Sequence, residues 1–175
     1  MASRLGAMRG AWFAAFVAFA LGITPQGAAA ASEDEARATF VLLLGKYVTW
    51  PASAFSSPSA PIVVAVMGNP RLAGEMQRLA AGQQFDGRSI EVREIADASG
   101  AASAHIVFAS DPAASSALAS AKPLRVIESK GNLRRTDIEI QMRDGRVAFG
   151  VNRRDAAQRG LKLSSKLLKL ASSID

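Results

Sequence analysis

Residues 146–174 read RVAFGVNRRDAAQRGLKLSSKLLKLASSI, and this stretch predicts a strand followed by two helices. Polar and apolar residues alternate over residues 146–151, which is the period of a half-buried strand. Asn152 can cap a helix that runs to Arg159, and Gly160 suits the position that ends it. After that glycine, apolar residues recur at spacings of four, three and four, which predicts one apolar face on a closing helix: Leu163, Leu167, Leu170 and Ile174.

Basic residues gather in and before this closing helix. Three of them recur at spacings of four and three beside the leucines: Lys162, Lys166 and Lys169. Such a stripe is either a solvated helix face, with cations favoured near the carboxyl end of the helix, or a contact surface for a partner. A second basic pair, Arg134 and Arg135, precedes the last two strands. Both groups are candidate partner-binding residues.

Upstream of this stretch, strands and helices alternate. Residues 62–67, IVVAVM, form a continuous apolar run, which is typical of a strand buried on both faces. A Gly68-Asn69-Pro70 turn and a helix over residues 71–81 follow, and this order predicts a parallel crossover unit. Further strands are predicted over residues 89–94, 105–109 and 124–127, with a helix over residues 112–121 before the last of them.

A hairpin completes the predicted sheet. Residues 138–142 and 147–151 alternate, and Asp144-Gly145 between them suits a type I′ turn, whose two central residues have positive φ. The sheet is therefore mixed, mostly parallel at first and antiparallel at its end. We predict a single α/β domain in three layers (α/β/α), in which helices flank the sheet and the hairpin lies near the carboxyl terminus.

An amphipathic helix is predicted over residues 33–46, ahead of the first strand. Four apolar side chains share one of its faces: Ala36, Phe40, Leu43 and Tyr47. The acidic residues at its start are favoured there by the helix dipole. Pro51 restricts Trp50 to an extended conformation and so ends the element.

Residues 1–31 have the three parts of a secretory signal peptide: a basic start with two arginines, an apolar run over residues 11–23, and a small-residue end. The apolar run is shorter than the roughly 20 residues that a membrane-spanning helix needs, so we predict cleavage near residues 29–31 rather than a retained anchor. Loss of the two arginines would lower the formal charge from +6 by two, to +4. Residues 32–175 are then a periplasmic domain without a transmembrane segment.

The chain offers few groups for catalysis. It contains one histidine, His105, and no cysteine. Disulfides, a thiol nucleophile and cysteine redox regulation are therefore excluded, and a zinc site is disfavoured. His105 begins a predicted buried strand, where a hydrogen-bonded structural histidine is favoured over a general base. We predict no enzymatic activity, no cofactor, no metal and no nucleic-acid partner.

Two motifs bracket the predicted domain. The first is an aromatic helix that ends in Trp-Pro, with Tyr47, Trp50 and Pro51. The second follows the last strand and consists of Asn152, Gly160, Leu161, Ser164 and Ser165. Together they resemble the YfiR family of exported proteins (the DUF4154 domain). We interpret these residues as structural, with Ser164 or Ser165 capping the closing helix.

The resemblance implies a periplasmic regulator that binds the periplasmic part of an inner-membrane diguanylate cyclase, or another sensor, and holds it off. It also suggests a homodimer. Where the family commonly has a Gly-Gly-Met-Ile-like segment, this chain reads RTDI at residues 135–138. The alternative is a periplasmic small-molecule binding protein, with its ligand at the carboxyl ends of the parallel strands, near Gly68-Asn69 and Ser110-Asp111.

Overall fold

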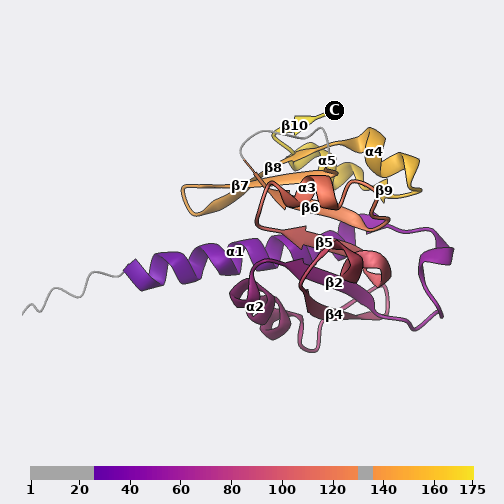
Figure 1. The fold of residues 1–175 in the computed structure, drawn as a ribbon, viewed down its shortest axis with the longest axis horizontal. Coiled ribbons are helices and arrows are strands. Elements are labelled where there is room, and N and C mark those ends of the chain that lie inside the picture. The colour runs from indigo at the N-terminus through magenta and orange to yellow at the C-terminus, as the bar shows by residue number, and fades with distance from the viewer. Residues whose placement is uncertain (1–25, 130–135) are drawn as a thin grey trace, which may run out of the picture.

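The computed structural model in Figure 1 describes residues 26–129 and 136–175 of the chain, the latter range including the carboxyl terminus. Its centre is an eight-stranded sheet. In spatial order the strands are β10 (Ser173–Ile174), β8 (Arg146–Val151), β7 (Ile138–Arg143), β6 (Leu124–Glu128), β5 (Ile106–Ala109), β2 (Ile62–Met67), β4 (Arg88–Ile95) and β3 (Gln84–Phe85).

The sheet is mixed, as predicted. The run from β4 through β2, β5 and β6 to β7 is parallel throughout. The β7–β8 and β3–β4 pairs are antiparallel, while β10 lies parallel to β8 at the edge. Asp144 and Gly145 have φ angles of 50° and 71°, which confirms the turn geometry predicted for the last hairpin.

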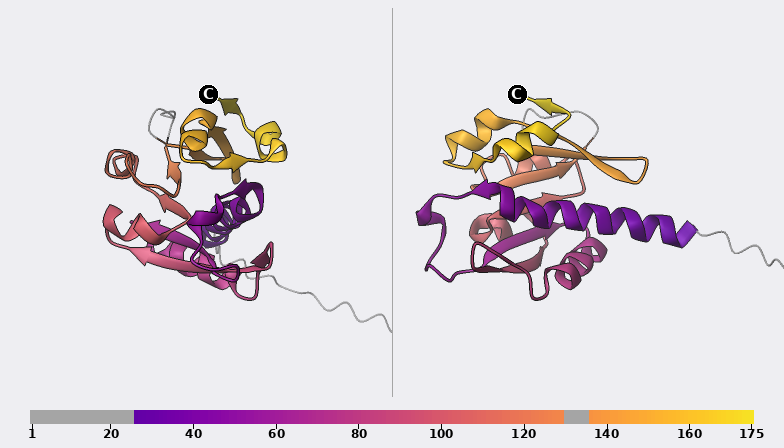
Figure 2. Two further views of the ribbon diagram at one scale, coloured as in Figure 1. Left: turned by 90° about the vertical axis from the view of Figure 1, so that its right-hand side faces the viewer. Right: turned by 180° about the vertical axis from the view of Figure 1, so that it is seen from behind.

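Helices cover both faces of the sheet, so the three predicted layers are confirmed (Figure 2). One face packs on α1 (Gln26–Tyr47), α2 (Pro70–Ala80), α4 (Arg153–Gln158) and α5 (Ser165–Leu170). The other face packs on the 3-10 helix η2 (Ala98–Ser103) and the short helix α3 (Ala114–Ala117). Neighbouring residues of β2 divide between the two cores, with Val64 facing the first layer and Ala65 the second. That alternation explains why β2 is apolar throughout.

The predicted crossover unit is present. β2 and β4 run parallel, and α2 connects them across one face of the sheet. Asn69 caps α2, because its side-chain oxygen accepts a 3.0 Å hydrogen bond from the Leu72 amide, and Pro70 occupies the first helical turn. The Gly68-Asn69-Pro70 turn is therefore a structural turn into a helix.

The helix predicted over residues 112–121 is wrong in length. α3 covers only Ala114–Ala117, and turns lead into and out of it. Within this alanine- and serine-rich stretch only Ala114 and Leu118 are buried. Short helices depend on tertiary burial for stability, and two buried side chains support about one turn.

The closing helix is also shorter than predicted. Leu163 belongs instead to β9 (Lys162–Leu163), which pairs with β1 (Val48–Thr49), and Ile174 belongs to β10. Ala171 is extended and ends α5, and the chain then pairs with β8 through the Ser172 amide and the Phe149 carbonyl, 2.8 Å apart. Sheet hydrogen bonds have replaced the last helical turn. Of the four residues predicted to form one apolar face, Leu167 is buried, whereas Leu170 and Ile174 are 71% and 48% exposed.

The first helix is buried through a different face from the predicted one. The side chains that enter the core are Ala38, Val41, Leu42 and Leu44. In the predicted set, Ala36, Phe40 and Tyr47 are partly buried, and Phe40 and Tyr47 pack against the edge of the core, whereas Leu43 is 39% exposed. α1 therefore has two apolar stripes, and the sequence pattern alone gives no means of ranking them.

The beginning of α1 lies earlier than predicted, at Gln26. Most of the predicted signal peptide, residues 1–25, lies outside the described residues, so its cleavage stays a prediction. Among the residues that the structure describes, no helix combines the length and the apolar character that crossing a membrane requires.

Two helical glycines give a matched test of this packing. A Cβ atom at Gly74 in α2 would meet open space, whereas one at Gly45 in α1 would lie 2.9 Å from the Phe85 ring. Because alanine favours a helix over glycine by about 1 kcal/mol, Gly74→Ala should raise the free energy of unfolding by about that amount. Gly45→Ala should lower it by about 1–3 kcal/mol through overpacking. Urea denaturation measures both, and equal effects would contradict the packing of α1 on Phe85.

Candidate functional site

The two sequence motifs are far apart in the sequence but lie side by side in the structure. β1 and β9 form a small antiparallel sheet in which Val48 pairs with Leu163 and Thr49 with Lys162. The Ser164 amide donates a 2.9 Å hydrogen bond to the Tyr47 carbonyl and extends this pairing by one residue. The sheet thus ties the end of α1 to the segment before α5.

Motif residues also define the turns around this small sheet. The Asn152 side chain accepts a 3.1 Å bond from the Asp155 amide and caps α4. Ser164 accepts a 3.2 Å bond from the Leu167 amide and caps α5, so Ser164 is the cap and Ser165 is the first helical residue. Gly160 has a φ of +77°, which glycine adopts without strain. A Cβ atom there would lie 3.7 Å from Pro51 of the other motif.

A pocket of about 520 Å³ opens beside the joined motifs. We call it the motif pocket, and its lining includes Trp50, Pro51, His105, Lys122, Arg159 and Leu161. His105 and Lys122 precede β5 and β6, so the pocket lies at the amino ends of these parallel strands. The sequence predicted a ligand site at the opposite, carboxyl ends.

At those carboxyl ends the polar side chains bond to one another and to the backbone. The Asn69 amide donates a 3.1 Å bond to the Ser110 hydroxyl, while its oxygen caps α2. Asp111 accepts a 2.8 Å bond from the Ala113 amide. These groups hold turns in place, which is the structural role that the sequence favoured for the glycine-containing turn.

The rings of Trp50 and His105 line one side of the motif pocket, and Phe55 packs on His105 next to it. The Trp50 indole nitrogen donates a 3.1 Å hydrogen bond to the His105 carbonyl. The Phe55 ring stacks on the imidazole of His105 with a centroid separation of 4.4 Å. On the far side of Phe55, the Arg88 guanidinium lies 3.7 Å from the ring centroid, in cation–π contact. The stack fixes the loop between β1 and β2 against the start of β5.

His105 is held by backbone groups on both ring nitrogens. Nδ1 accepts a 3.0 Å bond from the Val63 amide, and Nε2 lies 3.1 Å from the Ala54 carbonyl. This arrangement assigns the proton to Nε2 of a neutral ring. Burial lowers the pKa of His105, the positive charge of Arg88 lowers it further, and the bond to Ala54 opposes both. The geometry fits the structural histidine that the sequence favoured.

Behind the pocket lies a buried ion cluster. Asp137 is fully buried, and its carboxylate accepts bonds from the Arg125 backbone amide (2.7 Å) and from the Arg125 guanidinium (3.0 Å and 3.3 Å). Arg159 forms an ion pair with the same carboxylate. Arg125 also reaches Asp155, at 3.2 Å, and the Ala119 carbonyl, at 2.9 Å. Two arginines and two aspartates therefore compensate one another across β6, β7 and α4.

Sequence reasoning missed this cluster, although the sequence carried two indications of it. Arg125 interrupts the otherwise apolar run LRVI of β6, and a cation at a buried strand position needs an acidic partner. Asp137 stands in the RTDI segment that departs from the family's pattern. These two indications do not identify which acidic residue pairs with which arginine. The partners are far apart in the sequence, and their pairing depends on the register of β6 and β7.

The predicted basic residues do not all lie on one helix. Lys166 and Lys169 are exposed on α5, but Lys162 is exposed on β9, before that helix begins. The prediction that all three lysines lie on one helix is therefore wrong. Lys166 and Lys169, which are on α5, share one exposed surface. Arg134 and Arg135 lie outside the described residues. In the two described ranges, no cluster of three or more histidine, cysteine or acidic side chains is suited to hold a metal ion.

A family model described as YfiR/HmsC-like matches residues 34–172 of the chain. The chain belongs to this family. Membership supports, at the level of the family, a periplasmic regulatory role in cyclic di-GMP signalling. The predicted resemblance is therefore confirmed, and the joined motifs are features of a family domain that spans both of them.

One solved structure shares the fold at low sequence identity, and no curated protein matches the chain. A conserved domain protein from Vibrio cholerae O1 biovar El Tor strain N16961 is 13% identical, with a TM-score of 0.53. The match covers 79% of this chain and 60% of that one. The ABC domain from Streptococcus pneumoniae in complex with L-Trp is 10% identical, with a TM-score of 0.47, over 77% of this chain and 59% of that one. This chain thus spans about 60% of the length of these structures.

The ion cluster predicts a large effect from a small substitution. Asp137→Asn keeps the shape of the side chain but leaves Arg159 without its anionic partner and Arg125 with Asp155 alone, so the free energy of unfolding should fall by about 3–5 kcal/mol. The exposed pair of Glu91 and Arg93 supplies the control, because Glu91→Gln should cost less than about 1 kcal/mol. Urea denaturation of both variants tests this, and similar losses would contradict the central role of Asp137.

His105 predicts a dependence of stability on pH. The pKa of His105 in the folded protein lies below the unfolded value of 6.5. Between these two pKa values, His105 is protonated in the unfolded chain and neutral in the folded protein. The stabilisation contributed by neutral His105 is therefore present above pH 6.5 and decreases as the pH falls from 6.5 towards the folded pKa. His105→Gln should cost about 1–3 kcal/mol near neutral pH, because the Val63 amide loses a well-placed acceptor.

The difference in unfolding free energy between the wild type and His105→Gln should then narrow as the pH falls from about 7.5 to about 5. Urea denaturation across this range gives the difference directly. Parallel curves for the two proteins would show that His105 does not titrate with folding.

Proposed function

We propose that this protein is a periplasmic repressor that binds the periplasmic sensor part of an inner-membrane diguanylate cyclase and holds the cyclase off. The observation that carries the proposal is the family match over residues 34–172, which spans both motifs and all the strands of the main sheet except β10. The neutral, doubly bonded His105 agrees with a binding protein rather than with an enzyme.

Repression needs only a difference in affinity. A domain that binds the inactive conformation of a receptor more tightly than the active one shifts the receptor towards inactivity by the ratio of the two affinities. Loss of the domain, or of its contact surface, then raises cyclic di-GMP in the cell. A rigid domain suits this role, because little ordering free energy is lost on binding.

The exposed basic side chains of α5 are the candidate contact. Lys166 and Lys169 lie one turn apart on α5. The start of this helix is hydrogen-bonded to the two-stranded sheet of β1 and β9, which we call the motif sheet. Exposed cations steer association with an acidic partner surface and tune its rate, while contributing little to folding stability. Their reversal is therefore expected to weaken partner binding and leave the fold intact.

The test is a pull-down from periplasm and solubilised membrane with the tagged domain, residues 32–175, followed by mass spectrometry. A membrane diguanylate cyclase should be recovered, and recovery should fall with Lys166→Glu/Lys169→Glu. The control is Arg78→Glu/Arg93→Glu, which makes the same change in net charge at exposed positions on α2 and β4. The control should recover the cyclase as well as the wild type does.

Recovery that is insensitive to the lysine reversals would retain the function and discard the α5 surface. Absence of any cyclase, together with unchanged cyclic di-GMP after deletion of the gene, would overturn the proposal. The small-molecule alternative would then take precedence. The observation in its favour is the motif pocket, whose size and mixture of aromatic and cationic side chains suit a small anionic or aromatic ligand. Thermal melting with envelope metabolites would identify such a ligand, because binding to the folded state raises the midpoint.

A further inference from the structure

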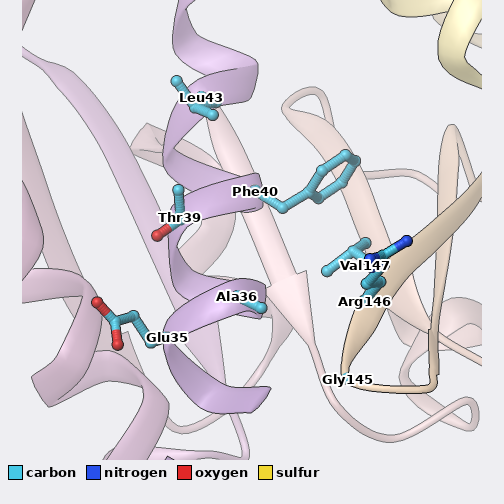
Figure 3. Close-up of a pocket in the computed structure, with 8 residues that line it drawn as sticks. All are labelled: Glu35, Ala36, Thr39, Phe40, Leu43, Gly145, Arg146 and Val147. Atoms are coloured by element: carbon cyan, nitrogen blue, oxygen red, sulfur yellow. The ribbon is translucent and has the colours of Figure 1, made fainter. Parts of the chain in front are cut away.

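A second hollow lies away from the motif pocket, between α1 and the β7–β8 hairpin (Figure 3). Its volume is about 470 Å³. We call it the hairpin cleft, and the residues that line it are Glu35, Ala36, Thr39, Phe40, Leu43, Gly145, Arg146 and Val147. Phe40 belongs to the aromatic helix of the first motif, and none of the lining residues belongs to the second motif or to the basic surface of α5.

The α1 wall of the cleft is the second apolar stripe of the helix, which is only partly buried. Ala36, Thr39, Phe40 and Leu43 follow one another at spacings of three, one and three, so they share a helical face. Phe40 packs on Phe149 of β8 at a centroid distance of 4.8 Å, which forms the inner end of the cleft. Leu43 is one of three large apolar side chains that the described residues expose.

The other wall contains a strand edge that the fold leaves open. β10 pairs with β8 only at Gly150 and Val151, and the Ser172 amide adds one bond to the Phe149 carbonyl. Backbone groups alternate in direction along a strand, so Val147 presents its N–H and C=O on the same side as Phe149, away from β7. No described strand pairs with β8 on that side at Val147.

The other two large exposed apolar side chains belong to β10 and to the helix before it. Ile174 belongs to β10, which is hydrogen-bonded to β8, and Leu170 ends the helix that leads into β10. Leu43, the third large exposed apolar side chain of the described residues, lies on α1, which packs on the face of the sheet beside β8. Apolar surface concentrated beside unpaired backbone is the pattern of an edge that receives another strand.

The charges at the cleft are opposite and separated. Glu35 and Arg146 both line the cleft, but the Glu35 carboxylate points away from the hairpin (Figure 3), on the side where Glu35 shares a second hollow with Arg78. Arg146 forms no ion pair with a described residue. Arg146 stands at the outer end of the open edge, next to the turn. A segment laid along the edge would therefore gain from an acidic residue opposite Arg146, and from apolar residues facing Phe40 and Leu43.

We propose that an extended segment of a partner protein adds to the open edge of β8 as a further strand, with alternate apolar side chains in the hairpin cleft and an acidic residue at Arg146. Main-chain hydrogen bonds to Val147 supply the pairing, and the cleft supplies the selection for apolar side chains. The chain's own carboxyl-terminal segment already pairs with the same edge at Gly150 and Val151. The inference rests on the proposed function only for the identity of the partner, an envelope sensor.

Two variants test the two parts of this site, the open backbone edge and the apolar cleft, and should not disturb the fold. Val147→Pro deletes an outward N–H that β7 does not use, and edge strands tolerate proline. Leu43→Glu places a charge in the cleft at a position that is already exposed. Lys46→Gln is the matched control, because it makes the same change in net charge at an exposed position on α1 outside the cleft. Melting midpoints of the three variants should lie within a few degrees of the wild type.

The experiment is photocrosslinking in cells that express the full chain with a benzophenone amino acid in place of Arg146, or in place of Arg93 on the distant strand β4 as a control. Crosslinks from position 146 should map by mass spectrometry to an extended, alternately apolar segment of a membrane sensor. Val147→Pro and Leu43→Glu should each lower their yield by about tenfold, and Lys46→Gln should not. Position 93 should give no such product.

The outcomes separate this inference from the proposed function. A cyclase recovered in the pull-down, with capture unaffected by Val147→Pro and Leu43→Glu, would retain the function and overturn the docking edge. Crosslinks that depend on Val147 and Leu43 but lead to an envelope protein without a cyclase domain would support the edge and overturn the function. Products that contain only a second copy of this chain would overturn the proposal, because the edge would then be a dimer interface.

Discussion

The carboxylate of Asp137 is the constraint on which the site depends. A fully buried anion is tolerated only where charges and hydrogen bonds compensate it, and here one arginine comes from β6 and the other from the end of α4. The backbone of the same residue bonds to the Arg125 carbonyl and to the Asn152 amide. Asp137 therefore joins β6, the start of β7, and both ends of α4. Because Arg159 also lines the motif pocket, the pocket wall takes its position from this buried pair.

Much of the fold could be predicted because the deciding patterns are local. The apolar run of β2, the Asn69 cap with Pro70 after it, and the Asp144-Gly145 turn each specify a conformation through residues that are neighbours in sequence. The failures came where tertiary contacts decide. The spacing of Leu163, Leu167, Leu170 and Ile174 fits a helix, yet the edges of β1 and β8 offered backbone hydrogen bonds that drew the first and last of them into strands.

The sequence identified several residues of the candidate site but not where these residues lie in the fold. Trp50, Pro51, Gly160 and Leu161 were identified by their motifs, but their meeting depends on the pairing of β1 with β9, two strands of two residues each. Strands so short carry no periodicity from which pairing could be read. The position of the pocket at the amino ends of β5 and β6 departs from the usual rule for parallel sheets, which places ligands at the carboxyl ends. The loop that carries Phe55 and the bond from Trp50 to His105 build the wall there instead.

The second apolar stripe of α1 connects these observations. A helix that needed only to cover the sheet would expose polar side chains on its outer side, and α1 instead exposes Leu43 there, beside Phe40, which packs on Phe149. At its carboxyl end the same helix continues directly into β1 and the motif sheet, while α5 leads from that sheet to the strand that partly covers β8. A strand added beside Val147 would contact α1 directly and lie in line with β10. The elements beside the proposed strand are therefore continuous with the elements that build the motif pocket.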